Sequence, residues 1–115
     1  MSLTIITPTT GSKYLQKCIE SVKKQKNQNF IYYIVIDGTK FIKNASEFLN
    51  DLPDNFKVIT LPENTGANGW NGHRIYISMS FITNSDYVMF LDEDNTIEPN
   101  HVDEMMTNII AVSYT

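Results

Sequence analysis

The strongest constraint on the fold is an apolar run that stops abruptly at three consecutive carboxylates. Tyr87–Leu91 is continuously apolar and has the length of a β-strand, and the next residues are Asp92, Glu93 and Asp94. An apolar run without alternation is typical of a strand buried on both faces, as in a parallel sheet covered by helices. Because ligands bind beyond the carboxyl ends of such strands, we expect these acids at a binding edge.

The carboxylates are candidate metal ligands. Asp92 and Asp94 would repel one another at close range, and a divalent cation between them would relieve the repulsion. Hard oxygen ligands of this kind suit Mg²⁺ or Mn²⁺, which commonly also bind substrate phosphates. An acidic surface turn that caps the next helix is the alternative interpretation of an isolated Asp-x-Asp pattern.

Length and composition predict one small globular domain. The chain has 115 residues, 42% hydrophobic and 11% aromatic, enough for about four βα units of roughly 30 residues. Its formal net charge of −4 argues against a nucleic-acid-binding protein. The sole cysteine, Cys18, lies among apolar residues at helical spacing and is expected in the core. No apolar run approaches the roughly 20 residues of a membrane span, so we expect a cytoplasmic protein without a transmembrane segment.

The rest of the chain alternates between predicted strands and helices. Runs rich in β-branched and aromatic residues predict strands at Leu3–Thr7, Phe30–Ile36 and Lys57–Leu61, with Pro8 ending the first. Apolar residues at helical spacing predict helices over residues 12–25, 41–52, 72–83 and 100–110. The pattern predicts an α/β fold with a mainly parallel sheet, and the polar residues after all four strands would share one site.

Two further segments contribute candidate ligand-binding residues. Asp37 follows the second predicted strand, where it either shapes a turn with Gly38 or faces the ligand beside the later acids. The loop from Glu63 to Gly72 holds three of the five glycines and leads into a helix whose first amides can hold an anion. Trp70 fits two interpretations equally, a core residue or a stacking platform for a base or sugar. The apolar residues expected on the buried face of this helix are Ile75, Met79 and Ile82.

In this order, the motifs resemble those of a family 2 glycosyltransferase with the GT-A fold, in its N-terminal half that binds the nucleotide sugar. The matching segments span nearly the whole chain and read Ile5-Ile-Thr-Pro-Thr9, Ile34-Val-Ile-Asp37-Gly-Thr39, Glu63-Asn-Thr-Gly66 and Val88-Met-Phe-Leu-Asp92-Glu-Asp94. The resemblance implies a Rossmann-like sheet with strand order 3-2-1-4 flanked by helices, as a single nucleotide-sugar-binding domain over residues 1–115.

The resemblance also implies a substrate and a set of site residues. The protein would bind a UDP-sugar donor for transfer to an acceptor that the sequence leaves unidentified. The residues expected to bind the nucleotide are Thr7, Thr9, Asp37, Asn64, Gly66, Arg74 and Asp92. Asp94, together with Asp92, would hold Mn²⁺ or Mg²⁺, which would neutralise the diphosphate leaving group.

The sequence departs from the family pattern in ways that limit the expected activity. Ile36 stands where the family often has a second acid, and Trp70–Arg74 replaces the usual Ala-Arg-Asn. Family members continue for roughly another half-domain, which carries the acceptor site and the catalytic base. We therefore expect the chain to be truncated relative to a full transferase and inactive alone, and we nominate no catalytic residue.

Truncation would also leave apolar surface uncovered. The outer edge of Asp86–Leu91 would lack a strand partner, and the last helix would lose part of the cover over its apolar stripe. The stripe consists of Met105, Met106, Ile109 and Ile110. We expect a homo-oligomer joined through that edge, the last helix, or both.

Two other functions fit parts of the sequence. The segment Asp92–Thr96 after an apolar strand also matches a haloacid-dehalogenase-like phosphohydrolase, in which Asp92 would be the nucleophile and Asp94 the acid or base. That family carries its motif on the first strand, whereas here the motif follows the last predicted strand. A non-catalytic nucleotide-binding module is the second alternative.

Overall fold

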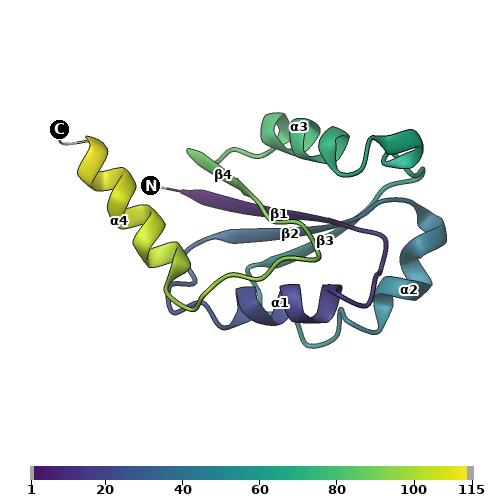
Figure 1. The fold of residues 1–115 in the computed structure, drawn as a ribbon, viewed down its shortest axis with the longest axis horizontal. Coiled ribbons are helices and arrows are strands. Elements are labelled where there is room, and N and C mark those ends of the chain that lie inside the picture. Colours follow the sequence, from purple (N-terminus) through teal and green to yellow (C-terminus); the bar gives the residue numbers. More distant parts are fainter. Residues whose placement is uncertain (1, 114–115) are drawn as a thin grey trace.

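The computed structural model describes residues 2–113, and for residues 110–113 it describes the backbone alone. Its parallel strands are β1 (Leu3–Thr9), β2 (Ile31–Ile36), β3 (Phe56–Thr60) and β4 (Tyr87–Phe90), in the order β3-β2-β1-β4. The helices are α1 (Leu15–Lys23), α2 (Ile42–Ser46), α3 (His73–Ile82) and α4 (His101–Ser113), with short 3-10 turns η1 (Thr39–Phe41) and η2 (Ala67–Gly69). Strand order and flanking helices confirm the predicted Rossmann-like fold (Figure 1).

Alternate residues of the strands build a core on each face of the sheet, because successive side chains of a strand point to opposite faces. On one face, Ile5 and Ile34 pack with the buried side of α1, including Cys18, which confirms its place in the core. On the other face, Ile6 and Val35 pack against α3. Figure 1 shows α3 on one side of the sheet and α1 and α2 on the other.

Strand β1 continues through Pro8, so the prediction that this proline ends the strand is wrong. β4 pairs with β1 only from Leu3 to Ile6, and Pro8 lies beyond that stretch, where no neighbouring strand needs its missing N–H. On its other side β1 stays in register with β2 through Thr9, which pairs with Ile36. The continuation carries Thr9 to the carboxyl edge of the sheet.

The second helix is shorter than predicted for residues 41–52. α2 ends at Ser46, whose hydroxyl donates to the Lys43 carbonyl at 3.0 Å, and Asp51 adopts a left-handed φ of 55°. Side chains that bond to the nearby backbone compete with helix continuation. Phe48 and Leu49 nevertheless pack against the core, as their helical spacing led us to expect.

The buried face of α3 also differs from the prediction. Ile75 and Met79 are buried as expected, but Tyr76 joins them and Ile82 is 73% exposed. Ile82 is the last residue of the helix, and the chain turns to an extended conformation at Thr83, so no further turn covers it.

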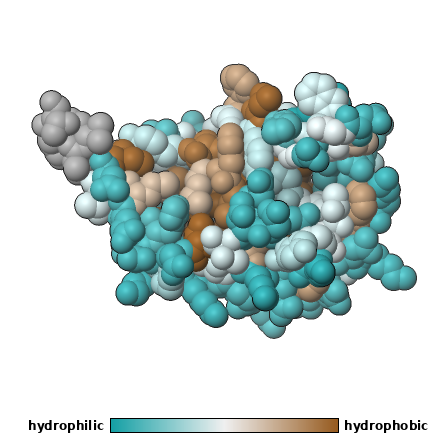
Figure 2. All heavy atoms as spheres, viewed as in Figure 1, coloured by the Kyte–Doolittle hydropathy of each residue, from teal (hydrophilic) through white to brown (hydrophobic). Residues whose placement is uncertain are grey.

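Strand β4 is outermost in the sheet and less buried than predicted. Its side chains are only partly buried, and Phe90 is 53% exposed, because no strand of the described chain pairs with its outer side. The N–H groups of Tyr87 and Leu91 donate toward β1, to the carbonyls of Ser2 and Ile6. The N–H groups of the alternate residues therefore face outward. Apolar side chains gather over this part of the surface, between α3 and α4 (Figure 2).

Helix α4 covers one end of the sheet. Val102 is fully buried, and the partly buried Met105 and Met106 pack against the core, so these two residues of the predicted stripe have cover. The Ile110 side chain lies outside the described residues. Among residues 2–113, none of the helices combines the length and the apolar character needed to cross a membrane.

Candidate functional site

A cavity of about 610 Å³ lies at the carboxyl ends of β1, β2 and β4. The strand order reverses between β1 and β4, and ligands of open α/β sheets bind at such switch points. The predicted site residues that line the cavity are Thr9, Asp37, Asn64, Gly66, Asp92 and Asp94. Further lining residues include Tyr14, Asn71, His73, Tyr76 and Glu93.

Asp37 organises the loop on the β2 side of the cavity. The residue is 4% exposed, and its Oδ1 accepts hydrogen bonds from the N–H and the hydroxyl of Thr65, both at 2.7 Å. Oδ2 accepts the Gly66 N–H at 2.8 Å. A Cβ on Gly66 would lie 2.5 Å from the Asn71 carbonyl oxygen, so only glycine fits this position. The carboxylate thus fixes a distant loop and does not act through its own turn with Gly38.

The three consecutive acids have different surroundings. The Thr9 hydroxyl donates to Glu93 Oε2 at 2.5 Å, which turns Glu93 back toward β1. The Tyr76 hydroxyl donates to Asp92 Oδ1. Within the described part of the chain, the Asp94 carboxylate has no hydrogen-bond or ion-pair partner. Asp94 and Oδ2 of Asp92 are therefore the carboxylate oxygens of this group that remain available to a ligand.

Tyr76 is the site residue that the sequence analysis missed. Burial, then the hydrogen bond to Asp92 and the charge of that carboxylate, raise the pKa of the Tyr76 phenol above its ordinary value. The phenol therefore remains a protonated donor around neutral pH. Its position three residues before Met79 would have placed it on the buried face of the helix, because residues three apart are neighbours on a helix.

Thr7 lies beneath the cavity and does not line it. Its fully buried hydroxyl accepts a hydrogen bond from Tyr32 at 2.7 Å and lies 3.8 Å from Cys18 Sγ. Burial raises the pKa of the Cys18 thiol, against the smaller opposing effects of its bonds to Tyr32 and Thr7. The structure thus places Thr7 in a buried polar cluster under the site.

Arg74 is also outside the cavity lining. Its guanidinium lies 4.1 Å from the centre of the Trp70 ring, an arrangement typical of a cation–π contact. Trp70 is 47% exposed, so its interpretation as a core residue is wrong. Among the described residues Arg74 forms no ion pair.

The available donors fit a cation that is shared with a ligand. Among the described side chains, no group of three or more His, Cys, Asp or Glu could hold a metal ion. Asp92 and Asp94 are nevertheless hard oxygen donors, and Mg²⁺ is commonly bound by one or two carboxylates together with waters and substrate phosphates. The site therefore suits a cation whose remaining ligands come from a bound phosphate compound.

These features define a Rossmann-like α/β domain with a polar ligand site: the order of the strands, the cavity at the switch point and the acids at the strand ends. A model of one family, described as glycosyl transferase family 2, matches residues 4–113. The chain belongs to glycosyl transferase family 2. The fold is accordingly of the GT-A type, and the phosphohydrolase alternative is set aside.

One curated relative and several solved structures are similar to this chain. The teichoic acid poly(glycerol phosphate) polymerase of Staphylococcus epidermidis is 33% identical over 95 residues, which are 81% of this chain and 12% of that protein. The crystal structure of S. aureus TarS matches with a TM-score of 0.72 and 23% identity, covering 96% of this chain and 20% of that one. TarS 1–349 in complex with UDP gives a TM-score of 0.72 and 23% identity, again over 96% of this chain but 32% of that one. The chain thus spans a minor part of the proteins it resembles.

Proposed function

We propose that this chain binds a UDP-sugar, the donor of a glycosyl transfer reaction, in the cavity at the carboxyl ends of β1, β2 and β4. The main support is that one cavity is lined by Asp37 and Gly66 at the β2 side and by Asp92 and Asp94 at the β4 side. A uridine and a diphosphate would need these two chemically distinct ends. TarS, a protein with the same fold, has been solved with UDP, which supports the choice of nucleotide.

The uracil and ribose would lie at the β2 side. Oδ2 of Asp37 accepts one internal hydrogen bond and keeps capacity for another, which suits the N–H of uracil or a ribose hydroxyl. Asn64 Oδ1 accepts the Gly66 N–H at 3.1 Å, which leaves the amide N–H groups free as donors. Thr9 supports the floor between the two ends through its bond to Glu93. Thr7 and Arg74 lie outside the lining, so we assign them no contact with the nucleotide.

The diphosphate would lie at the β4 side, where the local charge is negative. The cavity holds the carboxylates of Asp37, Asp92, Glu93 and Asp94, so a bare diphosphate would be repelled. We propose that Asp94 and the free oxygen of Asp92 hold Mn²⁺ or Mg²⁺ there. When bound, the cation would neutralise charge that develops on the diphosphate as the glycosidic bond breaks.

We propose that the chain supplies the donor-binding step and needs further residues for transfer. Asp37 and Glu93 are engaged by Thr65 and Thr9, and Asp92 and Asp94 are assigned to the cation. No cavity carboxylate is then left to act as general base toward an acceptor. A non-catalytic nucleotide-binding module would use the same site and would differ in lacking any role in turnover. We also propose a cytoplasmic location, where nucleotide sugars are available.

A thermal-shift panel of nucleotides and nucleotide sugars, with and without Mn²⁺, tests the proposed function. A ligand at about 100 times its Kd adds roughly 2.7 kcal/mol to the free energy of unfolding, which is about 10 °C in Tm for a domain of this size. We expect UDP and UDP-sugars with Mn²⁺ to raise Tm, and purine nucleotides to leave it unchanged. A preference for a purine nucleotide, or no response to any uridine nucleotide, would contradict the proposal.

We further propose that a second copy of the chain pairs with the outer edge of β4. The outward backbone groups of Val88 and Phe90 have no strand partner in the described chain, and no lysine or proline lies in β4 to discourage pairing. Phe90 is exposed, and so is Phe81 of α3. Apolar side chains gather on the surface between α3 and α4 (Figure 2). Because α4 packs against the core, the edge of β4 is the preferred of the two predicted surfaces.

A further inference from the structure

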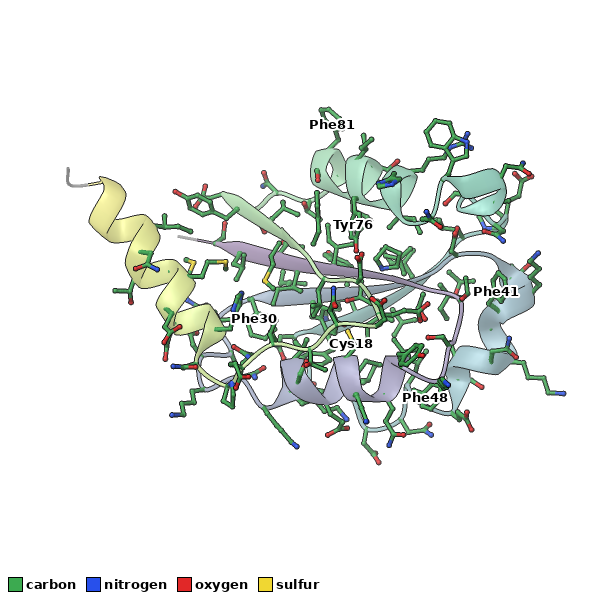
Figure 3. The ribbon with its side chains drawn as sticks, in the orientation of Figure 1. Cys18, Phe30, Phe41, Phe48, Tyr76 and Phe81 are labelled. Carbon is green, nitrogen blue, oxygen red and sulfur yellow. The ribbon has the colours of Figure 1, made fainter. Side chains whose placement is uncertain are left out.

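Tyr76 connects α3 to the first of the three acids. Its hydroxyl donates to Oδ1 of Asp92, which lies 16 residues further along the chain. Its ring stacks on Phe90, with the ring centres 4.3 Å apart and an interplanar angle of 22°. Figure 3 shows Tyr76 reaching from α3 toward the sheet, whereas Phe81 of the same helix points away from it.

A glycine makes room for this ring. A Cβ on Gly72 would lie 2.9 Å from Pro8 Cγ and 3.3 Å from Tyr76 Cε2, so the backbone, Pro8 and the tyrosine are in close contact. The ring is held by Phe90 and by this contact, and its hydroxyl has little freedom to leave Asp92. Both Gly72 and Tyr76 line the cavity.

Asp92 is also held through its backbone. The Cys18 thiol donates to the Asp92 carbonyl oxygen at 3.7 Å, from the side of the sheet opposite to Tyr76. An exposed aspartate without such contacts would sample several rotamers, and ordering it on ligand binding would cost free energy. With Oδ1 bound to Tyr76, Oδ2 is the carboxylate oxygen of Asp92 without a hydrogen-bond partner among the described residues.

We infer that Tyr76 is a positioning residue that fixes the Asp92 carboxylate so that one oxygen, Oδ2, is presented to the cation and diphosphate. The inference rests on the proposed function, because it requires Asp92 to be a ligand of the bound cation. Tyr76 acts through Asp92. Loss of its hydroxyl therefore weakens UDP binding in the presence of the cation, because only that binding uses Asp92.

Tyr76→Phe tests this role, because it keeps the ring stacked on Phe90 and removes only the hydroxyl. UDP is titrated by calorimetry at a series of Mn²⁺ concentrations, well below the Tm of both proteins. We expect the Kd for UDP with Mn²⁺ to rise about tenfold, and the half-saturating Mn²⁺ concentration to rise with it, because a hydrogen bond to a charged group is lost. In EDTA the wild type and the variant bind UDP equally weakly.

Thr4→Val is the matched control. It removes a buried hydroxyl that bonds to Ser85, near the start of β1 and outside the cavity lining. Removing a hydroxyl that has a purely structural role lowers Tm but does not change the Mn²⁺ concentration needed for UDP binding. We expect this result for the control. Tyr76→Phe is also introduced into Asp92→Asn, where it should add no further loss, because the residue through which it acts is already altered.

The outcomes separate the inference from the function on which it rests. A wild-type chain that binds no UDP at any Mn²⁺ concentration would overturn the proposed function, and the inference with it. In another outcome, the wild type binds UDP with Mn²⁺, and Tyr76→Phe is folded and has the same Mn²⁺ requirement. This result would overturn the positioning role and leave the proposed function in place. Additive losses in the Asp92→Asn background would also overturn it.

Discussion

Asp37 and Gly66 are 29 residues apart in sequence and are joined by a hydrogen bond of 2.8 Å from the Gly66 N–H to the Asp37 carboxylate. With the two bonds from Thr65, this contact ties the end of β2 to the loop after β3. The loop backbone therefore depends on a carboxylate that also faces the cavity. Stability and ligand binding are coupled at this residue.

Asp37→Asn is expected to lower both stability and affinity for UDP. An amide has one acceptor oxygen, and its NH₂ group would face a backbone N–H of Thr65 or Gly66, donor against donor. Leaving a buried donor unsatisfied costs about 1–3 kcal/mol, which urea or thermal unfolding would measure. Asp54→Asn, at an exposed position, serves as the control and should unfold like the wild type. A Tm for Asp37→Asn equal to that of the wild type would contradict the coupling.

Asp94→Asn is expected to remove the metal dependence of UDP binding without loss of stability. The Asp94 carboxylate has no partner among the described residues, so its replacement should change the free energy of unfolding by no more than about 0.5 kcal/mol. Mn²⁺ alone should leave the Tm of the wild type unchanged, because two carboxylates need phosphate oxygens to complete the site. Titration of UDP with and without Mn²⁺ checks both expectations. UDP binding by the wild type that is unaffected by EDTA would remove the assigned role of Asp94.

The isolated chain is expected to transfer no sugar at a meaningful rate. Donor binding alone supplies neither an oriented acceptor nor a base, and these together account for much of the rate enhancement of a transferase. A coupled assay of UDP release from UDP-sugars, with a panel of acceptors, makes the measurement. Robust acceptor-dependent release of UDP would show that a base is present in this chain after all.

The chain is expected to form a homo-oligomer through the outer edge of β4. Val88→Pro removes an N–H that faces outward and leaves the bonds to β1 in place, so it should yield monomers. Val58→Lys, on the opposite edge strand β3, is the control and should leave the assembly intact. Light scattering after size-exclusion chromatography measures the mass of each protein. A monomeric wild type at high concentration would contradict the proposed pairing.

The residue pattern by itself predicted the alternation of strands and helices and one shared site at the strand ends, and the resemblance to the family predicted the strand order. Polar residues after each apolar run mark the strand ends, and parallel strands bring those ends to one edge of the sheet. Thr9, Asp37, Gly66, Asp92 and Asp94, which were expected to share one site, all line the same cavity. Helix and strand periodicity likewise placed Cys18 in the core.

Only the tertiary structure decided what each of these side chains touches. The contact of Asp37 with the Thr65–Gly66 loop, and that of Tyr76 with Asp92, join residues on different elements. Thr7 and Thr9 are two residues apart on one strand, yet one hydroxyl faces a buried tyrosine and the other faces Glu93. Local periodicity fixes which face of a strand or helix is buried, but hydrogen-bond partners depend on distances between elements, which packing alone sets.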